Sequence, residues 1–125
     1  MARRSEIYSC ELCGNIVEVL ESTDGTLVCC GQEMVLQKEN STNAAQEKHV
    51  PVVTVSGTTA NVQVGSVAHP MEEQHHIAWI ELQQGNKGQR VRLKPGEAPQ
   101  AVFFIEADVP FAVRTYCNLH GLWQA

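Results

Sequence analysis

The sequence predicts a mainly β fold in two parts, a small metal-stapled module followed by an immunoglobulin-like β-sandwich or small barrel. Four cysteines within the first 30 residues indicate the module, because together they can hold one metal ion. Short valine-rich and aromatic segments, separated by glycine and proline, indicate the β domain. The polar segment between them contains no large apolar residue. We therefore expect a module at residues 1–37, a linker at residues 38–46 and a β domain at residues 47–125.

The module is too short to bury a self-sufficient core, since domains below about 40 residues usually need a metal, disulfides or oligomerisation. Its two apolar stretches occupy residues 16–20 and 26–28. The Ser-Thr-Asp-Gly sequence at residues 22–25 separates them, and this composition favours a hairpin turn between two paired strands. A bound metal is the expected staple, with self-association as a further support.

The β domain should consist of short strands, because no segment combines a sustained helical period with good capping residues. Apolar and polar residues alternate along residues 59–64, which places Ala60, Val62 and Val64 on one face. Glycine and proline interrupt the series between the strands. The expected strands are residues 50–56, 59–64, 77–82, 90–93, 101–106 and 111–116.

The formal net charge of −5 argues against nucleic acid and against an anionic membrane surface as partners. No apolar run approaches the roughly 20 residues that a membrane-spanning helix needs. The first residues are charged and are not followed by an apolar segment, so no signal peptide is expected. These features predict a cytoplasmic protein whose cysteines serve metal or thiolate chemistry rather than disulfides.

The cysteines of the module form the pattern Cys10-x-x-Cys13 followed by the adjacent pair Cys29 and Cys30. Four thiolates suit tetrahedral zinc or a single iron ion. A structural zinc ribbon is the simpler interpretation of such a module. Adjacent cysteines should strain the angle between their sulfurs, and this strain favours a redox-active iron centre. The pattern strongly indicates a metal site and leaves the choice of metal open.

All histidines of the chain follow the expected linker. They can gather at one end of a sandwich, where strand ends and loops cluster, together with the unpaired Cys117. Imidazole ligands suit iron, copper, zinc and nickel, and a thiolate shifts electron density onto the metal. The five histidines are His49, His69, His75, His76 and His120.

Two classes of metal site fit this second set of residues. A blue-copper electron carrier uses two histidines, one cysteine and usually a methionine. No methionine follows His120, although Met71 could substitute from elsewhere in the chain. The other class is a mononuclear iron enzyme with several imidazoles in a plane, a thiolate on the axis and one open position.

The residues at these candidate sites also resemble a known family over essentially the whole chain. The cysteine pattern is similar to a desulforedoxin-type module, which is related to rubredoxin. The later motifs resemble a neelaredoxin-like domain, and they are Glu47-Lys48-His49-Val50-Pro51, His69-Pro70-Met71 with His75-x-Ile77-x-Trp79, and Cys117-Asn118-x-His120-Gly121. Together they are similar to desulfoferrodoxin, a family of superoxide reductases with two centres.

The resemblance implies two iron ions in each chain. The first would be held by Cys10, Cys13, Cys29 and Cys30. The second would have four equatorial nitrogens and an axial thiolate, supplied by His49, His69, His75, His120 and Cys117. We treat His76 as a non-ligand, because the family commonly has tyrosine there and neighbouring strand residues point to opposite faces.

The resemblance also implies one-electron reduction of superoxide to hydrogen peroxide, with two protons from solvent and without release of dioxygen. Lys48 would attract the anion and Glu47 would help to displace peroxide, although each can instead be a solvated surface charge. The backbone N–H groups of Leu119 and His120, and the side chain of Asn118, can hydrogen-bond the axial sulfur. A rubredoxin-like electron donor and a homodimer are further expectations.

Overall fold

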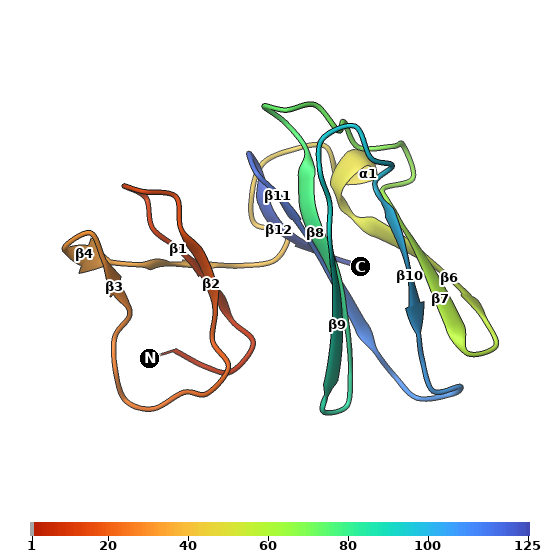
Figure 1. Ribbon diagram of the computed structural model, residues 1–125, viewed down its shortest axis with the longest axis horizontal. Coiled ribbons are helices and arrows are strands. Elements are labelled where there is room, and N and C mark those ends of the chain that lie inside the picture. The colour runs from red at the N-terminus through yellow and green to blue at the C-terminus, as the bar shows by residue number, and fades with distance from the viewer. Residues whose placement is uncertain (1) are drawn as a thin grey trace. The chain divides into compact units, whose positions relative to one another are not determined.

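The computed structural model describes residues 2–125, and the chain divides after Lys38 into two β-structured units (Figure 1). We call the part up to Lys38 the cysteine unit and Glu39–Ala125 the histidine unit. The one α-helix in the described residues is the four-residue α1 (Gln46–His49). The predicted mainly β fold is confirmed. No helix of residues 2–125 has the length and apolar character to cross a membrane.

The larger of the two sheets in the cysteine unit is antiparallel and three-stranded, in the order β2–β1–β5. A separate hairpin joins β3 to β4. Few of its large apolar side chains are buried, Ile7 and Val19 among them, so a hydrophobic core contributes little. The strands are β1 (Ile7–Ser9), β2 (Ile16–Glu18), β3 (Val28–Cys29), β4 (Gln32–Glu33) and β5 (Val35–Gln37).

The hairpin predicted between residues 16–20 and 26–28 is wrong. β2 pairs with β1, and β3 pairs with β4 across the two-residue turn of Cys30 and Gly31. Both turn residues have positive φ, 53° at Cys30 and 78° at Gly31, as a type I′ turn requires. The adjacent cysteines therefore lie at the sharp turn, whereas residues 22–25 lie in a longer connection between strands of different sheets.

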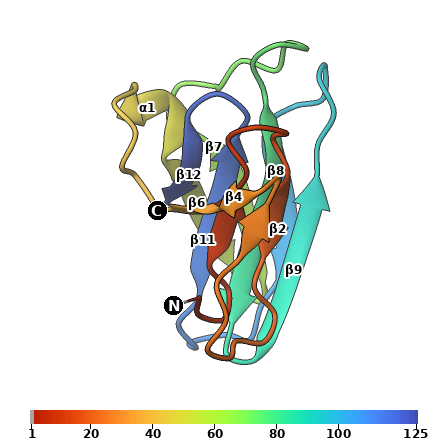
Figure 2. The same cartoon turned by 90° about the vertical axis from the view of Figure 1, so that its left-hand side faces the viewer.

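The histidine unit is a sandwich of two antiparallel sheets. The three-stranded sheet has the order β10 (Gln100–Phe104), β7 (Thr59–Val64), β6 (Pro51–Ser56). Figure 2 shows the strands of the four-stranded sheet side by side, in the order β12 (Gly121–Gln124), β11 (Ala112–Cys117), β8 (Ile77–Gln84), β9 (Lys87–Arg92).

The core of the histidine unit confirms the predicted alternation along β7. Ala60, Val62 and Val64 are at most 2% exposed and belong to one apolar cluster with Ile80 and Leu82 of β8. A slip of one residue would turn these side chains towards solvent, so their burial fixes the register of the strand. The histidine unit therefore has an apolar core of its own, independent of any metal.

Each of the six strands predicted for this unit has a counterpart in the structure, with ends shifted by up to three residues. The strand β12 was not predicted, because the last strand that we expected ended at residue 116. β12 pairs with β11 along its whole length, from Gly121 opposite Cys117 to Gln124 opposite Arg114. This pairing places the turn between Cys117 and Gly121 at the end of the sheet.

Glu39 and Asn40, near the start of the expected linker, are attached to the end of the histidine unit. Asn40 donates its backbone N–H to the carbonyl oxygen of Leu122 at 2.9 Å. Its side chain exchanges two hydrogen bonds with the backbone of Gln124, at 3.1 and 2.8 Å. Glu39 forms an ion pair with Arg114 at 3.5 Å. Hydrogen bonds and an ion pair, rather than apolar packing, therefore hold this polar segment beside β12.

Candidate metal centres

The four cysteines of the cysteine unit meet in one cluster, from the turn after β1 and from the β3–β4 hairpin. Their sulfurs all lie within 4.8 Å of one another. The Sγ atoms of Cys13 and Cys29 are 3.6 Å apart, and those of Cys29 and Cys30 are 3.9 Å apart. A tetrahedral site with metal–sulfur bonds of about 2.3 Å separates its sulfurs by about 3.8 Å. The cluster therefore fits one tetrahedral ion and is too wide for a disulfide.

Backbone amides of the cysteine unit point towards this cluster. Cys13 donates its N–H to the sulfur of Cys10 at 3.4 Å. This hydrogen bond, assisted by the N–H of Leu12, lowers the pKa of Cys10 to about 6. Hydrogen bonding to the sulfurs of Cys13 and Cys29 instead raises the pKa of Cys30 to about 12. One sulfur is thus ready to ionise, while complete deprotonation of four neighbouring thiols requires a cation.

The second cluster lies at one end of the sandwich of the histidine unit. His49 is the last residue of α1 and Cys117 is the last residue of β11. His69 lies in the loop after β7, His75 lies two residues before β8, and His120 lies in the turn from β11 to β12. The fold therefore brings together residues that are up to 71 positions apart in the sequence.

The four imidazole rings of this cluster form a closed square. Neighbouring ring centroids are 4.6 Å apart for His49 and His69, 4.7 Å for His69 and His75, 5.1 Å for His75 and His120, and 4.8 Å for His120 and His49. Each neighbouring pair is nearly perpendicular, with interplanar angles of 79°, 81°, 81° and 84°. Across the square, His49 and His75 are 6.3 Å apart and within 30° of parallel.

Backbone carbonyls fix the protons of two of these rings. The Nδ1 atom of His49 is 2.7 Å from the carbonyl oxygen of Ala45, and that of His69 is 2.7 Å from the carbonyl oxygen of Pro70. A carbonyl oxygen only accepts, so Nδ1 carries the proton and Nε2 of each neutral ring has a lone pair. The two Nε2 atoms face each other at 3.1 Å. Two acceptors at this distance need a cation between them.

The other two rings extend the same argument. The Nε2 atom of His75 is buried and has no hydrogen-bond partner in the part of the chain that the structure describes. A buried polar nitrogen without a partner is costly, and a metal ion would satisfy it. His120 faces the cluster with Nδ1, which is 3.0 Å from Nε2 of His49. The square thus offers four nitrogens to one ion.

Cys117 adds a sulfur to this square. Its ligand atom and those of His49, His69 and His75 all lie within 4.8 Å of one another, and its Sγ is 3.8 Å from Nδ1 of His120. Burial raises the pKa of the Cys117 thiol, while hydrogen bonds from the N–H groups of Leu119 and His120 lower it in part. Those two amides can therefore stabilise the thiolate, as expected from the sequence.

Burial also sets the charge of the histidines. It lowers the pKa of His69 to about 4 and holds the pKa values of His49 and His75 below the ordinary value for histidine. A neutral imidazole is the form that binds a metal. At neutral pH these rings are therefore ready to act as ligands.

Trp123 packs against the imidazole square, and the sequence did not identify it as part of the site. Its ring stacks on that of His49, with centroids 4.8 Å apart and planes within 29°. Its indole N–H donates to the carbonyl oxygen of His120 at 3.1 Å. The side chain is 1% exposed. Its position three residues after His120, inside a strand that we did not predict, offered no clear signal.

Two neighbours of the cluster lie outside the square. The Nδ1 atom of His76 is 3.1 Å from the carbonyl oxygen of Glu72, away from the other rings. The side chain of Asn118 was expected near the sulfur, and this expectation is wrong. Asn118 donates Nδ2–H to the carbonyl oxygen of Gln74 at 3.0 Å and accepts the N–H of His76 at 2.8 Å.

Glu47 and Lys48 precede His49 in α1, and their side chains are exposed. Burial is the main reason that the pKa values of His49 and His75 are lowered, and the positive charge of Lys48 adds to the effect at both rings. The carbonyl oxygen of Glu47 accepts the N–H of Val67 at 2.9 Å. A Cβ atom at Gly65 would lie 2.5 Å from that oxygen, so only glycine allows α1 to pack there.

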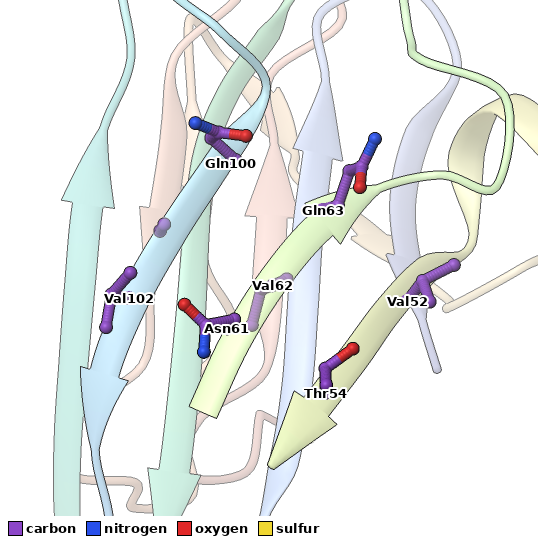
Figure 3. A pocket seen from close by; sticks show the side chains of 8 residues that line it. Val52, Thr54, Asn61, Val62, Gln63, Gln100 and Val102 are labelled. Carbon is purple, nitrogen blue, oxygen red and sulfur yellow. The ribbon is translucent and has the colours of Figure 1, made fainter. Parts of the chain in front are cut away.

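Met71 does not join the cluster as a sulfur ligand. Its Sδ accepts the N–H of Ile77 at 3.4 Å, and its side chain packs against the apolar core. A separate hollow of about 340 Å³ lies on the outer face of β6, β7 and β10 (Figure 3). Valine, threonine and amide side chains line it, and none of its lining residues is a histidine or cysteine.

Family profiles match both units of this chain. The profile described as desulfoferrodoxin matches residues 41–125, and that described as desulfoferrodoxin, N-terminal domain, matches residues 2–37. A desulfoferrodoxin from Syntrophotalea carbinolica is 55% identical over 125 residues, which cover 100% of this chain and 98% of that protein. A desulforedoxin from Megalodesulfovibrio gigas is 60% identical over 37 residues, which cover 30% of this chain and 100% of that protein.

A solved structure is similar over almost the full length. The superoxide reductase from Treponema pallidum matches with a TM-score of 0.77 and 32% sequence identity, covering 98% of this chain and 99% of its own. The similarity therefore extends over both units of this chain.

Proposed function

The chain belongs to the desulfoferrodoxin family, and we propose that it is a superoxide reductase that holds one iron ion in each unit. The observation that carries this proposal is the square of four imidazoles with one buried thiolate beside it. The donor atoms fit the metal, because a buried unpaired nitrogen and two facing lone pairs need a cation.

The two sets of donors suit different tasks. Four sulfurs complete a tetrahedral site and leave no position for a substrate. Five donors leave one position free on an ion that accepts six. We assign Cys10, Cys13, Cys29 and Cys30 to the first centre, and His49, His69, His75, His120 and Cys117 to the second. The second centre is therefore the reactive one.

Ferrous iron, when bound there, supplies the electron that converts superoxide, with two protons from solvent, into hydrogen peroxide without releasing dioxygen. Superoxide is an anion, and the chain has a formal net charge of −5, so a local positive charge is needed to attract it. The exposed ammonium group of Lys48 serves this purpose, since its charge is felt at both His49 and His75. The exposed carboxylate of Glu47 helps the peroxide to leave.

The residues around the sulfur tune its donation. The N–H groups of Leu119 and His120 place positive ends of dipoles at the Cys117 sulfur. Such hydrogen bonds offset part of the thiolate charge and raise the reduction potential of a bound iron. Leu119 and His120 are two and three residues after Cys117 in the sequence. A backbone that forms this turn therefore also places both N–H groups at the sulfur.

Three further properties complete the proposal. A rubredoxin-like protein supplies the electron for each turnover. The chain forms a homodimer through the cysteine unit, which is supported by the exposed apolar side chains of Leu12, Leu20 and Val28, 65%, 73% and 60% exposed. The location is the cytoplasm, where the free thiols of both clusters stay reduced.

Metal analysis together with the reaction products tests the assignment. The expected result is two iron ions per chain, one with a sulfur-only spectrum, and formation of hydrogen peroxide from superoxide without dioxygen. One zinc and one copper per chain would instead support a blue-copper electron carrier with a structural zinc ribbon. That alternative is not favoured, because Met71 is engaged with Ile77 and four imidazoles converge rather than two. Dioxygen release would contradict the reductase assignment.

A further inference from the structure

Asn118 connects the two segments that carry the ligands of the histidine cluster. Its backbone N–H donates to the carbonyl oxygen of His76 at 3.1 Å. Its side-chain oxygen accepts the N–H of His76 at 2.8 Å, and its side-chain nitrogen donates to the carbonyl oxygen of Gln74 at 3.0 Å. These hydrogen bonds hold both neighbours of His75, and Asn118 itself lies between Cys117 and His120.

The segment around His75 has otherwise mainly local hydrogen bonds. The backbone groups of His75 pair with those of Glu72, at 2.9 and 3.1 Å, within the same loop. The ladder between β8 and β11 is irregular at this point, because Tyr116 pairs with Trp79 while Cys117 pairs with Ile77. A bulge of this kind breaks regular pairing and redirects side chains next to a site. Asn118 continues the connection beyond the bulge.

We propose that Asn118 is a positioning residue that holds His75 in the imidazole square, at a fixed distance from Cys117 and His120. The Nε2 atom of His75 is buried without a protein partner among residues 2–125, so no hydrogen bond at this nitrogen holds the ring in place. Its neighbours His49 and His69 do have such bonds, to the carbonyl oxygens of Ala45 and Pro70. The position of His75 therefore depends more on its backbone than the positions of His49 and His69 do.

The role requires an amide side chain. Asparagine offers an acceptor and a donor on one short side chain, and it uses both here. Aspartate keeps the acceptor for the N–H of His76 but places a negative oxygen against the carbonyl oxygen of Gln74. Alanine removes both interactions. Asn118→Asp therefore removes one of the two side-chain hydrogen bonds, and Asn118→Ala removes both.

Metal retention by the full-length chain tests the proposal. Protein loaded with Co²⁺ is titrated with a chelator, and the absorption of each centre is followed separately, so that the cysteine centre serves as an internal standard. Loss of an outer partner of a ligand typically weakens metal binding by about 10- to 100-fold. We expect Asn118→Ala to weaken Co²⁺ binding at the histidine centre by about 10-fold or more and to shift its spectrum, with a smaller effect for Asn118→Asp.

Glu73→Gln is the matched control, because Glu73 is exposed in the same loop and its change should leave both centres as in the parent chain. A second test combines Asn118→Ala with His75→Ala. If Asn118 acts through His75, its change should weaken Co²⁺ binding less than about twofold once His75 is absent, because the two effects are coupled. An undiminished effect in that background would overturn the proposal, as would parental affinity and spectrum in Asn118→Ala.

The proposal rests on the assignment of the imidazole square as a metal centre, but its readout does not depend on the reaction. A parent chain that binds Co²⁺ at both centres and fails to reduce superoxide when loaded with iron would overturn the proposed function and leave the role of Asn118 intact. A parent chain that binds Co²⁺ only at the cysteine centre would overturn both. Asn118→Asp, which changes few atoms, provides the measurement if Asn118→Ala does not fold.

Discussion

The two units present their candidate ligands in opposite ways. In the cysteine unit the ligands lie within 21 consecutive residues, from Cys10 to Cys30, and Cys13 and Cys30 are exposed. In the histidine unit they extend from His49 to His120 and come from the helix, the loop between β7 and β8, a strand end and a turn. His49, His69 and Cys117 there are buried.

This difference follows from how each unit is stabilised. The cysteine unit has few buried apolar side chains, so a metal ion would take the place of a core. The histidine unit has a sandwich core, which can hold ligands in place before a metal arrives. A metal that replaces a core must be fully coordinated, whereas a metal supported by a core can keep one position free. The metal that stabilises a unit and the metal that carries the reaction are thus assigned to different units.

Metal removal should produce the largest difference in stability between the two units. In the full chain without metal, we expect the cysteine unit to unfold, because a structural metal contributes about 10 kcal/mol or more to the folding of a small module. The sandwich should stay folded. Amide hydrogen exchange measures this, with fast exchange in β1 and β5 and continued protection in β7 and β8. Protection of β1 without metal, or loss of protection in β7, would contradict the comparison.

Replacement of the lone sulfur should affect the reaction and spare the other centre. We expect Cys117→Ser to lower superoxide turnover by about 100-fold or more, since loss of even an outer partner of a ligand costs about 10- to 100-fold. The thiolate-to-iron absorption band of the histidine centre should disappear. The spectrum of the cysteine centre in the same sample is the control. Retention of the band and of turnover would show that Cys117 is not a ligand.

Replacement of Trp123 should test the support that the core gives to the ligands. We expect Trp123→Leu to lower the free energy of unfolding of the histidine unit by about 3 kcal/mol, because it removes a buried aromatic side chain that stacks on His49. Trp123→Phe keeps an aromatic ring but loses part of the buried ring volume and the hydrogen bond to the carbonyl oxygen of His120, for which we expect a smaller loss of about 2 kcal/mol.

The free energy of unfolding of both variants is measured by urea denaturation, monitored by amide hydrogen exchange in β7 and β8. The metal centre of the cysteine unit should keep its parental spectrum. Equal losses for the two variants would assign the whole effect to the hydrogen bond and the lost ring volume rather than to the stacked aromatic ring.

Removal of the positive charge beside the square should have the smallest effect. We expect Lys48→Ala to slow superoxide capture by about 3- to 10-fold at low salt, and less as ionic strength rises, because the attraction is electrostatic. The iron spectrum should be unchanged. Rapid-mixing kinetics measures the rate. The matched control is Lys87→Ala, which removes the same charge from the exposed end of β9. Equal slowing by both changes would assign the effect to net charge alone.

Local features of the chain were predictable from the sequence. Cys10 and Cys13 have a spacing that binds metals in a single turn, and the adjacent pair Cys29 and Cys30 needs no long-range folding to bring its sulfurs close. The alternation along β7 likewise predicted its buried face. The turn at residues 22–25 shows the limit, because a turn-forming composition does not determine which strands pair on either side of it.

By itself, therefore, the sequence determined the mainly β fold, the two groups of metal-binding residue types and the backbone N–H donors that follow Cys117. Only the tertiary structure decided that His75 and not His76 faces the other rings, that Asn118 clamps the loop of His75, and that Trp123 lies under His49. The physical reason is the distance along the sequence between the residues that are in contact. Spacing and alternation act within one segment, whereas these contacts join segments that meet only when both sheets pack around a common core.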